Sequence, residues 1–289
     1  MNNTSSAVQP IAKPVKPNFK RILLAVLLLF VIAATLAPIA WVISTSLKDR
    51  AETFKIPPTL IPQRIYWQNY LVIWKTQPFG RYFLNSVILA FGTCVVGLAI
   101  ANLAAYGFSR FYMRFHSQLL TVILVTQMVP SVLLIIPYFL MMSKLGLLNS
   151  YSALIIAYIS FALPFCTWML KGYYDSIPKE IDEAALIDGC NQTQLMLKVV
   201  FPLTLPGNIA TLIFAFLLSW NEFLFALSLA KDQTMFTIPV GIALFIGEYR
   251  VAWNEIMATA VVASLPTIIL YVLIDKYLVN GLVEGSVKI

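Results

Sequence analysis

The feature that most constrains this chain is a series of long apolar runs. The first extends from Ile22 to Leu47 and is interrupted only by small polar residues and by Pro38. At a rise of about 1.5 Å per residue, about 20 helical residues cross the hydrocarbon core of a bilayer, so this run is long enough to span it. It is too long for a signal peptide and lacks a small-residue cleavage site. We therefore interpret it as a transmembrane helix.

The same test applied along the chain predicts about six membrane spans. Hydrophobic residues make up 60% of the 289 residues and charged residues only 11%, whereas the surface of a water-soluble chain must carry more charges. Within lipid each span must be a helix, since unpaired backbone groups cannot be satisfied there. The sequence thus predicts an all-α polytopic membrane protein. The expected spans are residues 22–47, 81–107, 118–142, 150–171, 203–230 and 255–278.

The spans form one transmembrane domain, residues 21–280, between two tails. Residues 1–20, rich in Asn, Ser, Lys and Pro, are expected to be a disordered cytoplasmic tail, and residues 281–289 a cytoplasmic C-terminal tail. An even number of spans puts both termini on one side. If that side is the cytoplasm, it holds eleven Lys and Arg residues against nine outside, and a basic stretch adjoins the first span. We therefore expect both termini to be cytoplasmic.

The loop between the fourth and fifth spans, residues 172–202, gathers carboxylates that are scarce elsewhere. Pro178 suits a first helical turn, and acids near it are stabilised by the positive end of the helix dipole. Gly189 can adopt the left-handed conformation that ends a helix. Ala184 and Ala185 leave a flat patch that another surface could approach. Four acids fall between residues 180 and 188, namely Glu180, Asp182, Glu183 and Asp188.

A second short helix is expected to follow this turn. Asn191 is placed to act as its N-cap, with Gln194 three residues later, and Pro202 then begins the next span. The loop is therefore predicted to be a helix, a sharp turn and a second helix that project from the membrane.

A metal site, a catalytic pair or a plain solvated face accounts for the acidic cluster less well. The four acids lack the set of His and Cys ligands that a transition metal would require, and the spacing of a calcium loop is absent. Paired acids for glycoside chemistry must flank a sugar in a cleft, which a helical hairpin does not provide. A solvated helix face would explain the charges but neither the two alanines nor the glycine. We expect no metal site and no catalytic residue.

The loop carries a motif that resembles the EAA signature of the permease subunits of ABC importers, E-A-A-x3-G-x9-I-x-L-P. The matching residues are Glu183, Ala184, Ala185 and Gly189, followed after nine residues by Val199, Val200, Phe201 and Pro202. Val199 and Phe201 replace the usual Ile and Leu conservatively. Much of the chain is similar to the second permease of maltose-type carbohydrate importers, including the segments 130–142, 176–189, 219–227 and 277–289.

This resemblance implies a mechanical role for the loop. In such importers the EAA helix docks on a cytosolic ATPase subunit, and ATP binding closes two ATPases and switches the permease pair from inward- to outward-open. By resemblance, the docking surface consists of Glu183, Ala184, Ala185, Asp188 and Gly189, and Glu183 is a candidate partner for a basic ATPase side chain. The C-terminal tail is expected to reach toward the ATPase through Gly281, Gly285, Ser286 and Lys288, although this chain ends in Ile289 where family members often end in Lys-Gly.

The resemblance also implies the partners. The chain contains no G-x4-G-K-[ST] phosphate loop, so ATP and Mg²⁺ are expected on two partner ATPase subunits, with no cofactor on this chain. The remaining partners are a second permease subunit, a periplasmic or lipid-anchored substrate-binding protein that meets the outer loop 231–254, and the lipid bilayer of the inner membrane. No nucleic-acid patch is visible, and the chain is expected not to be an enzyme.

Polar residues within the spans are candidates for the substrate path, because burying them in lipid is costly. Hydrogen bonding between helices would explain the same residues. The candidates are Asn85, Gln127, Trp220, Asn221 and Glu222, and Trp220 could stack on a sugar.

The sequence therefore predicts a permease subunit of an ATP-driven importer for a sugar or sugar-like solute. A polyol or a glycerol phosphate remains an alternative cargo. A secondary transporter would need its own coupling-ion site and usually inverted repeats, and neither is visible. An enzyme within the membrane would need a catalytic constellation, yet Glu222 is the one acid placed well inside a span.

Overall fold

The computed structural model describes residues 19–246 and 251–286, and side chains to residue 274. In this part of the chain the regular structure is helical, apart from one isolated bridge between Ile246 and Val251. The elements are α1 (Phe19–Ser46), α2 (Arg50–Thr53), α3 (Gln68–Thr76), α4 (Phe79–Arg110), α5 (His116–Val125), η1 (Thr126–Met128), α6 (Ser131–Lys144), α7 (Tyr151–Asp175), α8 (Lys179–Ile187), α9 (Gln192–Gln194), η2 (Leu195–Val200), α10 (Phe201–Leu203), α11 (Leu205–Trp220), α12 (Leu224–Leu229), α13 (Ile238–Ala243) and α14 (Trp253–Ser286).

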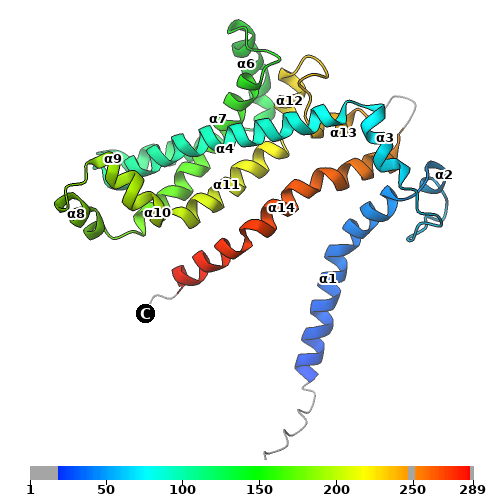
Figure 1. The fold of residues 1–289 in the computed structure, drawn as a ribbon, viewed down its shortest axis with the longest axis horizontal. Coiled ribbons are helices and arrows are strands. Elements are labelled where there is room, and N and C mark those ends of the chain that lie inside the picture. The colour runs from blue at the N-terminus through cyan, green and yellow to red at the C-terminus, as the bar shows by residue number, and fades with distance from the viewer. Residues whose placement is uncertain (1–18, 247–250, 287–289) are drawn as a thin grey trace, which may run out of the picture.

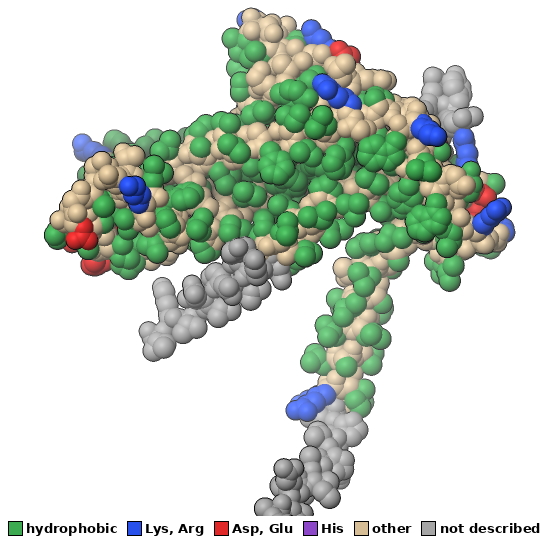
Figure 2. Space-filling view, in the orientation of Figure 1, with side chains coloured by type: hydrophobic (Ala, Val, Ile, Leu, Met, Phe, Trp, Pro, Cys, Tyr) green, Lys and Arg blue, Asp and Glu red, His purple; other side chains and the backbone are tan. Residues whose placement is uncertain are grey.

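Among the described residues, four helices are long and apolar enough to cross a membrane, namely α1, α4, α7 and α14 up to Ile274. Two bent pairs pass the same test together, which gives up to six spans if each pair counts as one. Hydrophobic side chains cover the middle of the visible face, and charged side chains gather toward its ends (Figure 2). The predicted class, an all-α polytopic membrane protein, is confirmed.

The third and fifth expected spans are bent rather than continuous helices. The segment predicted as 118–142 bends by 95° between η1 and α6. Pro130 lies at the bend, where it has no N–H to donate, and Val129 before it is extended, as a residue preceding proline prefers.

The fifth expected span, 203–230, is broken on both sides of α11. The chain bends by 79° at Thr204, so the helix starts at Leu205 rather than at Pro202, and it ends at Trp220. A short helix, α12, follows after three residues. Interrupted helices are tolerated at membrane depth where neighbouring protein groups satisfy the freed backbone.

The core lies where α4, α7 and α11 run side by side (Figure 1). Buried alanines on these helices allow their backbones to approach closely, as in other membrane bundles; they include Ala90, Ala101, Ala105, Ala157, Ala162 and Ala215. The α8–α10 segment projects from one end of this bundle (Figure 1). The helix α1 packs on α14 near its own C-terminal end and stands away from the rest of the body.

The expected tails fall mostly at the edges of the described chain. Residues 1–18 of the N-terminal tail lie outside the described residues, and α1 begins at Phe19. Gly281, Gly285 and Ser286 belong to the last turns of α14, and Lys288 lies outside the described residues.

Candidate functional site

The loop after α7 forms the predicted helix, turn and helix. Helix α8 starts directly after Pro178, and its last carbonyl groups are capped by the backbone of the turn. The amide of Gly189 donates to the carbonyl of Leu186 (3.1 Å), and the amide of Cys190 donates to that of Ala185 (3.0 Å). This pair of bonds is a Schellman motif, which needs a left-handed residue at its centre. Gly189 has φ +88°, so its predicted conformation is confirmed.

The second half of the turn is closed by a capping box, also as predicted. The Asn191 side chain accepts a hydrogen bond from the amide of Gln194 (2.9 Å), and the Gln194 side chain accepts one from the amide of Asn191 (3.0 Å). Because both caps are made by residues next to one another in sequence, the shape of the turn depends little on the rest of the fold.

The two alanines of the motif differ in their exposure to solvent. Ala184 is exposed together with Glu183 and Asp188, whereas Ala185 is buried against the protein's own core. Ile187, beside the turn, has 86% of its surface exposed. The outward face of α8 therefore combines carboxylates with apolar side chains, and acidic atoms are visible at this end of the molecule (Figure 2).

The four carboxylates between Glu180 and Asp188 do not act together. Glu180, Glu183 and Asp188 are exposed, while Asp182 is buried in an ion pair with Arg110 at the end of α4. Among the described residues, no group of three His, Cys, Asp or Glu side chains is arranged to hold a metal ion. Nothing in the sequence pattern indicates the ion pair, because its members are 72 residues apart in the chain.

A buried polar network near α8 also lies outside the sequence-based predictions. Asn102 of α4 accepts a hydrogen bond from the Tyr174 hydroxyl of α7 (2.8 Å) and donates one to the Asn208 side chain of α11 (2.7 Å). Asn208 in turn donates to the Thr204 hydroxyl (3.1 Å) at the bend before α11. Asn85 is a candidate in the sequence because burying a polar side chain within a membrane span is costly. The same criterion applies to Asn102 and Asn208, so it could have identified them from the sequence.

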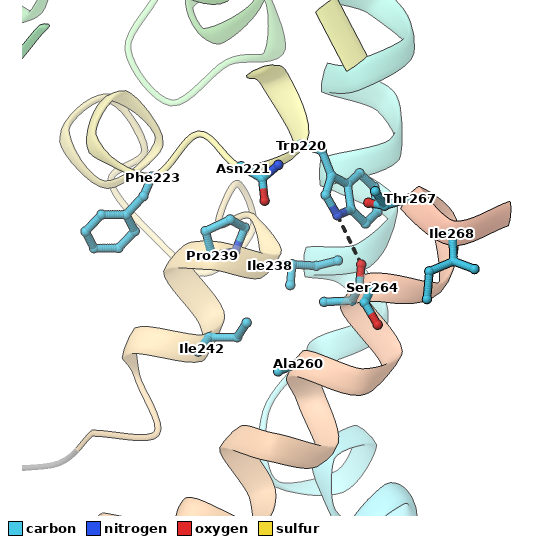
Figure 3. A pocket seen from close by; sticks show the side chains of 11 residues that line it. Trp220, Asn221, Phe223, Ile238, Pro239, Ile242, Ala260, Ser264, Thr267 and Ile268 are labelled. Atoms are coloured by element: carbon cyan, nitrogen blue, oxygen red, sulfur yellow. Dashed lines mark hydrogen bonds between the residues drawn. The ribbon is translucent and has the colours of Figure 1, made fainter. Parts of the chain in front are cut away.

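Two of the five substrate-path candidates line one pocket of about 540 Å³ between α11, α13 and α14 (Figure 3). Trp220 forms part of its wall; the indole N–H donates to the carbonyl of Ala263 (3.1 Å), and the ring is stacked on Phe216. With only 4% of Trp220 exposed, little ring surface is left for a solute. Asn221 lies at the rim, where its amide also donates to the carbonyl of Leu217 (2.8 Å).

The polar side chains in this pocket are Asn221, Ser264 and Thr267, and none of its described lining residues is charged. Apolar groups of α13 and α14 make most of the remaining wall (Figure 3). Such a surface offers hydrogen bonds and apolar contact to a ligand without any ionic partner.

Gln127 and Glu222 lie instead in a second pocket of about 360 Å³, next to the two helix breaks. The Gln127 amide donates to the carbonyl of Phe161 (2.7 Å). Both oxygens of Glu222 accept backbone hydrogen bonds, from Phe225 (2.8 Å) and Ala226 (3.0 Å), so this carboxylate caps the start of α12. Glu222 thus satisfies backbone amides at a helix break, and Gln127 joins the segment before Pro130 to α7.

Asn85 belongs to neither pocket, since its side chain is fully buried and all its bonds are internal. It donates to the carbonyls of Thr234 (2.9 Å) and Phe236 (2.8 Å) and accepts from the Tyr151 hydroxyl (2.6 Å). It therefore fixes the loop before α13 to α4 and α7. The structure divides the five candidates among three places rather than bringing them into one site.

Comparison with known proteins gives concordant matches. The family model described as "Binding-protein-dependent transport system inner membrane component" matches residues 94–283. The sulfoquinovosyl glycerol transport system permease protein SmoH of Agrobacterium fabrum is 38% identical over 253 residues, covering 88% of this chain and 89% of that protein. The trehalose/maltose transport system permease protein MalG of Thermococcus litoralis is 35% identical over 274 residues, covering 93% and 97%.

The fold also matches solved structures. One chain in the crystal structure of a bacterial ABC transporter involved in the import of the acidic polysaccharide alginate superposes with a TM-score of 0.76 and 24% identity. The match covers 92% of this chain and 99% of that chain. The overall arrangement of helices is thus shared with a transporter subunit.

Proposed function

This chain belongs to the family of binding-protein-dependent transport system inner membrane components, and we propose that it forms, with a second permease subunit, the path of a sugar or sugar-like solute through an ATP-driven importer. Its relatives include permease proteins named for the transport of trehalose, maltose and sulfoquinovosyl glycerol. The chain itself performs no chemistry and binds no cofactor; ATP and Mg²⁺ bind to two partner ATPase subunits.

The observation that carries this proposal is the exposed α8 turn at one end of the bundle. Glu183 and Ala184 point outward, and Gly189 holds the turn at φ +88°. An ATPase subunit docks on this face through Glu183, Ala184, Asp188 and the apolar side chain of Ile187. Ala185 supports the face from beneath, because it packs into the core. The end of α14, with Gly281, Gly285, Ser286 and then Lys288, extends toward the same ATPase.

Docking of a cytosolic ATPase on α8 sets the orientation of the chain, because it places the α8 end of the bundle in the cytoplasm. If the α8 end is cytoplasmic, α14 starts outside and runs back toward the cytoplasmic end (Figure 1). Counting each bent pair as one span gives six spans, which places the N-terminus on the same side as the C-terminus. The loop before α13, held by Asn85, then lies outside, where a periplasmic or lipid-anchored binding protein delivers the solute.

The pocket at Trp220 favours an uncharged cargo. Its polar groups, Asn221, Ser264 and Thr267, are neutral amides and hydroxyls that suit the hydroxyl groups of a sugar or polyol. A glycerol phosphate would bring a charge that no described residue of this pocket balances.

Thermal unfolding of the cognate binding protein against a solute panel tests this choice. Neutral sugars and polyols are expected to raise its Tm, because a bound ligand stabilises the native state. The solute that does so should also be taken up by vesicles that contain both permeases and the ATPase, in the presence of ATP.

Glycerol phosphate, an acidic sugar and an amino acid serve as the comparison solutes in the same panel. If only a charged solute stabilises the binding protein and enters the vesicles, the assignment of a neutral cargo is wrong. If no solute enters in an ATP-dependent manner, the importer function itself is wrong.

A further inference from the structure

A buried ion pair joins the α8 turn to the bundle. Arg110 is the last residue of α4, and Asp182 lies in the first turn of α8. The Arg110 Nε and the Asp182 Oδ2 are 2.6 Å apart, and the two side chains are only 6% and 12% exposed. Since both charges are largely withdrawn from water, each depends on the other for compensation.

Arg110 holds more than the carboxylate. Its Nη2 donates to the carbonyl of Ile177, in the turn that leads into α8 (3.2 Å), and also reaches Asp182 Oδ1 (3.4 Å). One guanidinium group therefore binds both the entry of α8 and its first turn, a geometry that the planar fork of arginine allows.

A second bond ties the other side of the loop to α4. The Tyr106 hydroxyl, one turn before Arg110, donates to the side chain of Gln192 in α9 (3.2 Å). The segments before and after Gly189 are thus both attached to the last turns of α4. The other charged pair nearby, Lys171 with Asp175, lies within α7, and Asp175 also accepts a hydrogen bond from the Ser109 hydroxyl of α4 (2.7 Å).

We propose that Arg110 and Asp182 are positioning residues that transfer the displacement of α8 to α4. This inference rests on the proposed docking of an ATPase on α8. Because both side chains are largely buried, they act through the backbone of α8 and make no contact with the ATPase. Without the pair, α8 can tilt about its flanking turns while α4 and the helices packed on it stay behind.

The number of solute molecules transported per ATP hydrolysed distinguishes this role from a purely structural one. A variant that merely lowers the amount of folded complex reduces transport and ATP hydrolysis in proportion, so the ratio stays constant. A variant that loosens α8 from α4 lets the ATPase turn over while the path no longer switches, so the ratio falls.

The test uses the complete complex in vesicles, with binding protein and solute. In Asp182→Asn, we expect transport per ATP to fall about tenfold, because the variant leaves the buried Arg110 charge uncompensated. The exchanged pair, Arg110→Asp with Asp182→Arg, should recover at least part of the ratio. Glu180→Gln is the matched control, and its ratio should stay within about twofold, since Glu180 is also an acid in the first turn of α8 but is exposed.

An unchanged ratio in Asp182→Asn, or an equal fall in Glu180→Gln, would overturn the inference. If the complex with Asp182→Asn does not assemble, Arg110→Lys is tested instead. This variant keeps the positive charge but loses the planar guanidinium group that binds two acceptors at once, so transport per ATP should fall about threefold. An unchanged ratio in that variant would overturn the inference as well. Failure of the proposed function is recognised separately, since the unmodified complex would then show no ATP-dependent transport.

Discussion

Glu183→Lys is expected to abolish the stimulation of ATP hydrolysis by the loaded binding protein, while the chain still inserts into the membrane. Glu183 is exposed on the outward face of α8 and is proposed to meet a basic side chain of the ATPase. Truncating one partner of a hydrogen-bonded charge pair in an interface costs about 2–5 kcal/mol, which corresponds to on the order of 30- to 4000-fold in affinity, and a reversed charge adds repulsion. Stimulated ATPase activity and transport in the reconstituted complex are measured together.

Glu180→Lys is the control for this variant. It makes the same charge change on an exposed residue of the same helix, one turn away. Stimulated activity should remain within about threefold of the unmodified complex, as is usual for an exposed charge without a close partner. Full stimulation in Glu183→Lys would contradict docking through this residue. An equal loss in both variants would show that only the net charge of α8 matters.

Gly189→Val is expected to prevent stable assembly with the ATPase. A β-branched residue is strained at φ +88°, at a cost of about 1–3 kcal/mol, or roughly 5- to 150-fold in the equilibrium between the native turn and its alternatives. No neighbouring atom lies within 4 Å of a Cβ atom added at this position, so the expected effect comes from the backbone conformation. Co-purification of the tagged permease with the ATPase measures it.

Gly146→Val is matched to that change. Gly146 also has a positive φ, +68°, and open space around it, but it lies near the start of α7, whereas α8 follows the end of that helix. This variant should lose a similar amount of stability and still bind the ATPase. Normal assembly of Gly189→Val, or an equal defect in Gly146→Val, would show that the turn is not what the ATPase binds.

The features that the sequence predicts well are those set by neighbouring residues. The helix, the left-handed Gly189 and the capping box of Asn191 and Gln194 form within a few residues of one another, so their pattern is visible in the chain itself. The positions of the spans follow from hydropathy for the same reason. Hydropathy does not reveal the breaks at Pro130 and near Glu222, because both lie within otherwise apolar segments, and the cap that Glu222 supplies forms only once the chain has turned there.

The sequence does not predict which side chains are buried or which groups they contact. Ala184 and Ala185 are equivalent in the motif, yet only the packing of α8 on the bundle shows that Ala185 is buried. Because burying a polar side chain is costly, Asn85 and Glu222 are expected to have hydrogen-bond partners. The sequence does not show whether such a partner is a solute or a backbone group of the protein. In the structure both side chains form hydrogen bonds with the protein's own backbone.

Photo-crosslinking from Ile187 tests most directly whether an ATPase subunit docks on the α8 turn. A photoreactive amino acid at Ile187, which is 86% exposed, should form an adduct with the ATPase subunit in the assembled complex. The same group at Ile56, which is 92% exposed in the loop between α2 and α3, should form none, because these two helices lie at the end of the molecule opposite α8 (Figure 1). Docking of the ATPase on the α8 turn is contradicted if the group at Ile187 yields no ATPase adduct, or if the group at Ile56 yields as much adduct.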